Sequence, residues 1–304
     1  MAKLNDYEQD QINADRELSV YKSDEMIQKA RFDLTKQEQK SILYAISKIK
    51  PDDTHLKEYD FDIKDFYRLC GIEKDTYTVL KGILEKLSDR GWWLTMPDGS
   101  ESRVRWFDVC RVNKNSGTVT IGFHKDMMPF LLQVAEQGKF FTSYNLKYVL
   151  PMKSKHSPRL YEILKSYQKN NLHWFFDIDK LKKLMGCESY KNFTDFNRFV
   201  LKPAVKEINE FSDLSIVYKE QREGRRVSRV IFYMDGKTDK ELLETWHHIQ
   251  EDLDGQVDLF DILMASKDDV GAQFMKERGE LHREERRQKE EQKARIKSWL
   301  DPEE

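Results

Sequence analysis

Apolar positions along this chain recur with two periods, one typical of helices and one typical of strands. Steps of three and four residues predict amphipathic helices, and strict alternation predicts strands that bury one face. We expect helices over 35–49, 65–70, 75–90, 125–137, 157–167, 179–185 and 192–211, with Ser157 as the cap of the helix over 157–167. We expect strands over 59–63, 92–96, 103–112, 118–123, 174–178, 214–221 and 227–234. Helices and a short strand followed by a hairpin are typical of a winged helix-turn-helix domain, and this order occurs twice.

One short sequence motif occurs twice in nearly the same form. Phe61–Ile63 leads into Leu69–Gly71, and Phe176–Ile178 leads into Leu184–Gly186. Both parts are shifted by the same distance, since 176 − 61 and 186 − 71 each equal 115. A repeat of this length is typical of tandem domains, because solenoid repeats are roughly 20–50 residues long. We therefore predict an α+β chain that contains tandem winged helix-turn-helix domains.

The domain boundaries follow from these elements. We expect a flexible leader at 1–22, a first winged-helix domain at 23–137, a linker at 138–156, a second winged-helix domain at 157–236 and a tail at 237–304. The tail is rich in charged residues, so we expect it to be mainly helical or disordered. The leader lacks the apolar segment of a signal peptide, and no run approaches the roughly 18 apolar residues that span a bilayer. We therefore expect a cytoplasmic protein.

Charge is distributed unevenly over these parts. Lysine plus arginine minus aspartate plus glutamate gives 23 − 24 = −1 for residues 1–150, 17 − 11 = +6 for 151–236, and 12 − 19 = −7 for 237–304. A basic domain is typical of a protein that binds phosphates, as in nucleic acid. An ordinary solvated surface is the alternative that the charge count alone leaves open.

The helix over 192–211 has one apolar face and one polar face. Its expected core residues recur at three- and four-residue steps: Phe193, Phe196, Val200, Ala204 and Ile208. In a helix-turn-helix unit the second helix enters the major groove with its N-terminal end leading. From this helix and its entry we predict DNA contacts by Lys191, Asn192, Thr194, Asp195, Arg198 and Lys202. An ordinary surface helix is the alternative. Pro203 should kink the helix or begin a second helical piece.

The hairpins add further candidate contacts. Around Gly224, the predicted wing of the second domain carries Arg222, Arg225, Arg226 and Arg229. Such a wing suits phosphates or the minor groove, although loop solubility is an alternative. In the first domain, the matching helix and hairpin offer Lys74, Thr76, Tyr77, Thr78, Lys81, Arg103 and Arg105, with Arg111 on the same hairpin. Because this domain is less basic, we expect it to add less affinity or to serve partly in protein contact.

Three long stretches carry a resemblance to a known family. They are "LTKQEQKSILYAISKI" (Leu34–Ile49), "FTSYNLKYVLPMKSKHSPRLYEILKSY" (Phe141–Tyr167) and "FNRFVLKPAVKEINEFSDLSIVY" (Phe196–Tyr218). With them the chain resembles, over roughly Tyr21–Met234, the plasmid replication initiator proteins of the iteron-binding Rep type.

This resemblance implies two winged-helix domains that bind double-stranded DNA at the direct repeats, or iterons, of a plasmid origin. It places the main base contacts at Lys191–Lys202. It further implies monomers active at the origin, dimers that repress the initiator's own promoter, and recruitment of the host helicase or its loader. The family has no catalytic residues, and we expect no cofactor and no metal. A dedicated winged-helix transcriptional repressor without initiator activity is the alternative.

The tail contains a short motif of a kind that binds other proteins. Gln256, Asp258, Leu259 and Phe260 resemble the short peptide by which bacterial proteins dock on the host sliding clamp. A short amphipathic helix that packs on the body is the alternative.

Enzyme motifs in the chain are incomplete. Gly236–Thr238 resembles the end of a phosphate-binding loop, but Ile231 occupies the position where that loop needs its first glycine. The adjacent His247 and His248 lack the spacing of a nicking-enzyme metal site.

Overall fold

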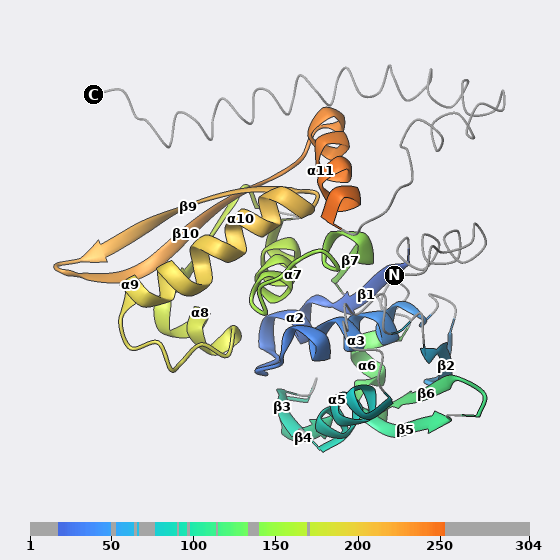
Figure 1. The fold of residues 1–304 in the computed structure, drawn as a ribbon. Coiled ribbons are helices and arrows are strands. Elements are labelled where there is room, and N and C mark those ends of the chain that lie inside the picture. The colour runs from blue at the N-terminus through green and yellow to red at the C-terminus, as the bar shows by residue number, and fades with distance from the viewer. Residues whose placement is uncertain are drawn as a thin grey trace. The chain divides into compact units, whose positions relative to one another are not determined.

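The computed structural model describes residues 18–49, 53–63, 66, 77–89, 91–95, 98–113, 115–132, 140–168 and 171–252. The chain divides into two compact units, residues 1–235 and 236–304. Both winged-helix domains lie in the first unit (Figure 1). In the second unit, the described part is mainly the helix α11 (Asp239–Asp252). The clamp-like peptide lies outside the described residues.

The first winged-helix domain is built around a small antiparallel sheet. Its elements are α2 (Asp24–Lys29), α3 (Lys36–Ser47), β2 (Glu58–Asp62), α5 (Tyr77–Asp89), β3 (Gly91–Thr95), β4 (Glu101–Arg105), β5 (Phe107–Asn113) and β6 (Thr118–Phe123). The sheet has the order β2-β6-β5, and β3 pairs separately with β4. Thr35 and Glu38 form a capping box at the start of α3, so two otherwise unpaired N–H groups are satisfied. Tyr44 of α3 packs on Phe61 of β2, with ring centroids 5.1 Å apart.

The second domain repeats this plan. Its elements are α7 (Ser157–Gln168), β8 (His173–Asp177), α8 (Ile178–Leu184), α9 (Phe193–Phe196), η3 (Asn197–Leu201), α10 (Lys202–Phe211), β9 (Leu214–Glu223) and β10 (Arg226–Gly236). The sheet order is β8-β10-β9, so in both domains the first strand pairs with the last. Phe61 and Phe176, the repeated residues, are 3% and 1% exposed on these first strands. The prediction of tandem winged-helix domains is confirmed.

The two domains meet at a junction that the sequence did not reveal. β1 (Ser19–Ser23) pairs antiparallel with β7 (Phe141–Asn145), so segments from both ends of the first domain lie side by side. The predicted leader at 1–22 is therefore too long, because Ser19–Lys22 belong to a strand. The predicted linker at 138–156 contains β7 and the turn η2 (Leu146–Tyr148), whose Leu146 is fully buried.

A buried polar cluster joins the first helix of the second domain to this junction. Glu162 of α7 forms an ion pair with Lys22 at 2.5 Å and accepts a hydrogen bond from the Tyr144 hydroxyl. Arg159 donates to the carbonyls of Ile27 and Ala30, both at 2.8 Å. Burial lowers the pKa of Lys22, although the charge of Glu162 opposes this shift. Because every charged member is paired, the cluster can be buried without an isolated charge.

A glycine makes the remaining close approach. Gly186 follows α8 with φ +62°, and a Cβ there would lie 2.9 Å from the carbonyl oxygen of Phe32 in the first domain. The Cys187 N–H donates to the Lys182 carbonyl and the Gly186 N–H donates to the Lys183 carbonyl, which is the Schellman pattern of a helix end. The position therefore requires glycine both for its backbone conformation and for its closeness to the first domain.

Three local predictions need correction. Of the helix expected over 125–137, the described part, 125–132, is a turn, η1 (Lys125–Met127), followed by a short helix, α6 (Met128–Leu131), because Pro129 lacks the N–H that one continuous helix requires. The strand expected over 103–112 breaks at the buried Trp106, whose ring stacks on Trp92 at 4.8 Å, so β4 and β5 belong to different sheets. Ser157 was expected to cap α7, but its buried hydroxyl has no partner among the described residues.

Candidate nucleic-acid interface

The candidate recognition helix of the second domain begins with a side-chain cap. Asn192 Oδ1 accepts a hydrogen bond from the Asp195 N–H at 2.7 Å, and Asn192 Nδ2 donates to Asp195 Oδ2 at 2.7 Å. This pairing satisfies an N–H at the start of the helix and fixes where the helix begins. Both residues were predicted to contact DNA, and the structure gives them this local role in addition.

The middle of the helix widens into a π-helical turn. In η3, the Lys202 N–H donates to the Asn197 carbonyl, five residues earlier. Pro203 follows in the first turn of α10 and has no N–H to offer the carbonyl four residues before it. The wider turn accommodates this missing bond, as π-bulges do inside helices. The prediction that Pro203 bounds a second helical piece is confirmed.

The helix separates its apolar and basic residues as its period predicts. Phe196, Val200, Ala204 and Ile208 are fully buried, and Phe193 is half-buried. Of the predicted contacts, Lys191, Asn192, Thr194, Arg198 and Lys202 are exposed, whereas Asp195 is half-buried. Two exposed residues were missed, Lys206 and Phe199. The four-residue step from Arg198 through Lys202 to Lys206 was the signal that could have found the lysine.

Acidic side chains of this helix turn away from the basic face. Glu207 accepts hydrogen bonds from the N–H groups of Lys153 and Ser154 at 3.1–3.2 Å. Asn209 is engaged as well, since it donates to the carbonyl of Ile216 and accepts from its N–H. The exposed charged side chains between residues 191 and 211 are all cations, whereas the three carboxylates are half-buried: Lys191, Arg198, Lys202 and Lys206 against Asp195, Glu207 and Glu210. Such a face attracts a polyanion.

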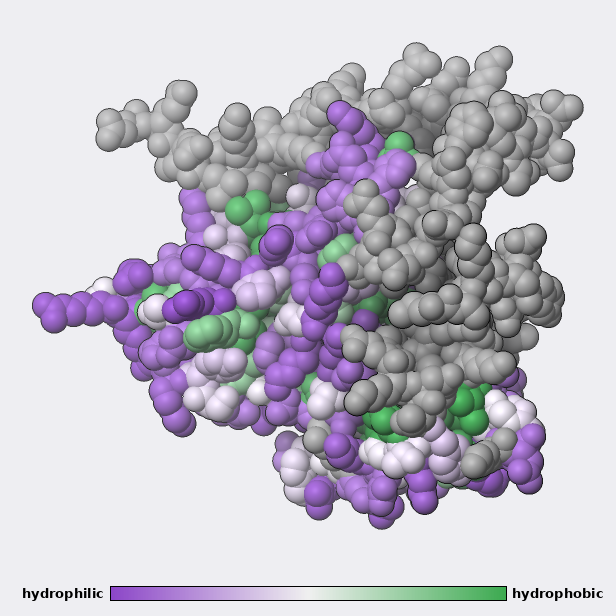
Figure 2. All heavy atoms as spheres, viewed as in Figure 1, coloured by the Kyte–Doolittle hydropathy of each residue, from purple (hydrophilic) through white to green (hydrophobic). Residues whose placement is uncertain are grey.

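The β9–β10 hairpin projects beyond the helices of its domain (Figure 1), and Figure 2 shows its tip as hydrophilic. The turn contains Gly224 with φ +60°. The predicted arginines do not form one free cluster. Arg222 pairs with Glu220 at 3.0 Å, Arg226 with Asp179 at 3.3 Å, and Arg229 with Asp177 at 2.7 Å.

Arg225 is the exception at this tip. It is exposed and has no carboxylate within ion-pair distance among the described residues. The three paired arginines lie at the surface, where ion pairs contribute little and a phosphate could replace the carboxylate. The wing therefore offers one unpaired cation and three that can exchange partners.

The first-domain candidates are more scattered. Lys74 and Thr76 lie outside the described residues. Thr78 and Lys81 are exposed on α5, and the Tyr77 hydroxyl donates to the Val112 carbonyl at 3.3 Å. The exposed face of α5 also carries acidic residues: Glu85 and Asp89.

The first-domain arginines were expected on one hairpin, and this was wrong. Arg103 and Arg105 are exposed on β4, which pairs with β3, whereas Arg111 lies on β5 in the other sheet. Arg111 forms a bidentate pair with Glu58, with N–O distances of 2.6 and 3.0 Å. The break at Trp106 is the cause, because it sends the two halves of the expected strand to different sheets.

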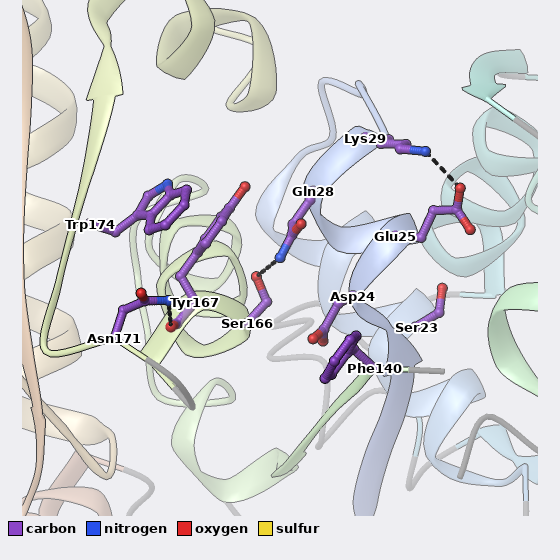
Figure 3. Close-up of a pocket in the computed structure, with 10 residues that line it drawn as sticks. All are labelled: Ser23, Asp24, Glu25, Gln28, Lys29, Phe140, Ser166, Tyr167, Asn171 and Trp174. Carbon is purple, nitrogen blue, oxygen red and sulfur yellow. Dashed lines mark hydrogen bonds and ion pairs between the residues drawn. The ribbon is translucent and has the colours of Figure 1, made fainter. Parts of the chain in front are cut away.

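A cavity of about 450 Å³ lies at the domain junction (Figure 3). Its walls include the aromatic residues Phe140, Tyr167 and Trp174, and the last two rings stack at 4.5 Å. Asp24 and Glu25 bring carboxylates to the same lining. Because carboxylates repel phosphate, this cavity is not part of the candidate nucleic-acid interface.

Comparison with known families agrees with this architecture. Residues 19–165 match the family model described as "Initiator Replication protein, WH1", and residues 177–234 match "Initiator Rep protein, WH2". The chain belongs to the initiator Rep proteins. The first of these matches begins at β1 and runs into α7, so it includes the junction that the domain boundaries drawn from the sequence had divided.

Individual relatives of this initiator Rep protein are distant. A "Replication initiation protein" of Escherichia coli is 27% identical over 230 residues, which cover 72% of this chain and 70% of the relative. A "PI protein" of Escherichia coli is 25% identical over 133 residues, 39% of this chain and 44% of the relative. Among solved structures, "Crystal structure of Pi initiator protein in complex with iteron DNA" is similar with a TM-score of 0.60 and 17% identity, covering 74% of this chain and 99% of that one. This likeness shows the shared fold.

Other kinds of site were sought in the same residues. Within the described ranges, no histidine, cysteine, aspartate and glutamate side chains gather in a group that could hold a metal ion. No helix there is long and apolar enough to cross a membrane.

Proposed function

We propose that this initiator Rep protein binds double-stranded DNA sequence-specifically at the direct repeats of a plasmid origin. The observation that carries the proposal is the candidate recognition helix, whose exposed charged side chains are all cations, while its carboxylates are half-buried. It begins at a capped, well-defined position and lies in the domain with the projecting hairpin. The solved relative that is described as a complex with iteron DNA supports the same choice of ligand.

Under this proposal, the recognition helix reads bases and the hairpin binds phosphates. Arg198 and Lys202 would enter the major groove, where arginine and lysine address guanine O6 and N7. Arg225 and its neighbours on the hairpin would bind the flanking backbone, which positions the domain without reading sequence. The first domain would add a second, weaker grip through Lys81, Arg103 and Arg105.

Initiation itself would require no bond chemistry by this chain. Binding and bending of the repeats would promote opening of the origin, and the host helicase or its loader would then be recruited. Monomers would act at the origin, and dimers would repress the initiator's own promoter. Incubation of supercoiled DNA with the purified protein and Mg²⁺ should leave the DNA uncut, and metal-dependent nicking would contradict this part of the proposal.

Footprinting on the DNA that flanks the protein's own gene tests the main proposal. Evenly spaced protected segments, about one or two helical turns apart, are expected if the ligand is a series of iterons. A single protected operator that overlaps the promoter would favour the alternative, a dedicated transcriptional repressor. Absence of any protected segment would contradict sequence-specific binding altogether.

The tail supplies a separate proposal that concerns a partner. Gln256, Asp258, Leu259 and Phe260 would dock on the host sliding clamp, with the leucine and phenylalanine as apolar anchors. These residues lie outside the described ranges, so the proposal rests on their sequence. Replacing Leu259 and Phe260 together by alanine should abolish clamp capture and leave iteron binding intact. A parent protein without measurable clamp affinity would end this idea.

A further inference from the structure

One exposed phenylalanine interrupts the basic face of the recognition helix. Phe199 is 52% exposed, whereas Phe196 of the same helix is fully buried. Its neighbours on the exposed side are cations, and the guanidinium carbon of Arg198 lies 5.2 Å from the centre of its ring. No other aromatic ring contact of Phe199 is found among the described residues. About half of this apolar side chain is therefore open to solvent, on the helix that the proposed function places against DNA.

The helix holds this ring in a defined place. Phe199 lies in the middle of η3, and the next two residues, Val200 and Leu201, are fully buried and anchor the turn in the core. A ring on such an anchored turn loses little further freedom when it makes a contact. Leaving it in water forgoes the favourable burial of apolar surface, which a partner in the groove would restore.

We propose that Phe199 reads the 5-methyl group of a thymine in the major groove. The inference rests on the proposed function, because it assumes that this helix enters the groove. Hydrogen-bond donors and acceptors occupy most of the major-groove edge of each base pair, and the thymine methyl is its apolar feature. A phenylalanine placed against a polar base edge would leave that edge without a partner. The ring should therefore select thymine at one position of the repeat.

The position of that thymine follows from the contact with Arg198. Successive bases of one strand are about 3.4 Å apart along the helix axis. The separation of 5.2 Å between the guanidinium carbon and the ring centre is shorter than two such steps, whatever its direction relative to the duplex axis. The thymine should therefore lie within two base steps of the guanine that the proposed function assigns to Arg198.

Uracil substitution tests the inference directly, because it removes the methyl group and keeps every hydrogen-bonding group. Each thymine of one footprinted repeat is replaced singly by deoxyuridine, and binding is measured by titration of the full chain. The wild-type protein should bind about fourfold more weakly when the contacted thymine is replaced, the effect expected for one buried methyl group. Phe199→Ala should bind thymine and uracil equally there, and Phe199→Leu should keep part of the preference.

Phe175 provides a matched control on the sheet of the same domain. It is 48% exposed and also lies under an arginine, with Arg229 at 5.0 Å, but it belongs to β8 and not to the recognition helix. Phe175→Ala should keep the full penalty for uracil at the same thymine. A thermal unfolding curve of each variant checks that the exposed substitution leaves the fold intact.

The outcomes separate this inference from the proposed function. An unchanged uracil penalty in Phe199→Ala, or no uracil penalty in the wild type, would overturn the role of Phe199 while iteron binding stands. If Phe199→Ala keeps normal DNA recognition but no longer binds a partner protein, the ring belongs to a protein interface, and the proposed thymine contact is likewise overturned. Absence of any specific duplex binding would refute the proposed function and the inference together.

Discussion

The two winged-helix domains share one strand order but present different surfaces. The exposed face of α5 in the first domain mixes Lys81 and Lys86 with Glu85 and Asp89. The exposed face of the second domain's recognition helix keeps its cations and directs Glu207 into hydrogen bonds with backbone N–H groups. The two copies thus share their strand order and differ in where their carboxylates lie, and this difference is why we expect the second domain to bind a polyanion more strongly.

The equivalent helices α3 and α7 are both buried along most of their length but bond to different parts of the chain. α3 begins with a side-chain capping box at Thr35, and its Gln39 donates to the Lys155 carbonyl at 2.7 Å. On α7, the buried Arg159 and Glu162 bond to Ile27, Ala30 and Lys22 of the first domain. The helix that opens the second domain therefore also holds it to the first.

The largest expected effect comes from breaking that junction. Glu162→Ala should lower the free energy of unfolding by about 3–5 kcal/mol, because it leaves Lys22 and Arg159 as buried charges without their carboxylate. Urea unfolding measures the change. Glu58→Ala, which removes the exposed partner of Arg111, is the control and should change stability little. Equal effects of the two substitutions would contradict the contrast between junction and surface.

The next effect separates the two candidate DNA-reading helices. Arg198→Ala should weaken specific binding by roughly 1–3 kcal/mol, the usual cost of one lost base contact. The equivalent change in the first domain, Lys81→Ala, should cost less, because acidic neighbours already reduce the field around α5. Titration of one iteron duplex with each variant provides the comparison. A larger loss for Lys81→Ala would reverse the assignment of the principal reader.

A pH effect is expected at the entry to α7, where His156 stands in the place that Thr35 takes before α3. Burial, aided by the nearby Lys155 charge, lowers the pKa of His156 from 6.5 to about 4. The unfolded chain gains this proton below about pH 6.5, whereas the folded protein does not until about pH 4. The neutral imidazole therefore makes its full contribution to the free energy of unfolding above pH 6.5. That contribution is lost as the pH falls, by about 1.4 kcal/mol at pH 5.5.

Urea unfolding at pH 7.5 and pH 5.5 measures this loss. His156→Gln should reduce the drop in stability between the two pH values by that amount, whereas His55→Gln, at an exposed position, should leave the drop unchanged. The Cys187 sulfur lies 3.4 Å from the His156 ring nitrogen, and burial raises the pKa of that thiol to about 12. The Cys187 thiol therefore stays neutral across this pH range and does not contribute to the measured pH dependence.

The smallest effect concerns the hairpin. Arg225→Ala should weaken binding about equally to all DNA sequences and reduce the slope of log affinity against log salt by about one, as expected for one lost phosphate contact. Arg222→Ala should have a smaller effect, because Arg222 must first leave Glu220. A change in sequence preference, instead of salt dependence, would place Arg225 at a base edge.

Local periodicity predicted much of the fold and the core face of the recognition helix. The 115-residue repeat predicted the tandem domains, and the repeated phenylalanines do occupy equivalent buried positions on the first strands of the two sheets. The junction was missed because Lys22, Arg159 and Glu162 read locally as solvent-exposed charges, and their pairing spans up to 140 residues. The π-helical turn η3 was missed for a different reason. A proline in the sequence predicts that a helix is interrupted, but not whether the interruption is a kink, a break or a π-helical turn.

The candidate site was predicted less completely than the fold. Exposure of Arg198 and Lys202 followed from helical phase. Phe199 was overlooked because an apolar residue out of phase with the core has no local explanation. The ion pair of Arg229 with Asp177 depends on strand register between β8 and β10, which no pattern within either strand contains. Arg226 pairs instead with Asp179 at the start of α8.

The pairing of β1 with β7 has a practical consequence for dissecting this protein. A fragment that begins at residue 23 would lose β1 and leave the edge of β7 open to other chains. A second-domain fragment cut at residue 157 would leave Arg159 and Glu162 of α7 without their partners Ile27, Ala30 and Lys22. A first-domain fragment should therefore start upstream of Ser19, and a second-domain fragment should carry polar substitutions on α7. Fragments cut at the apparent domain boundaries are expected to aggregate.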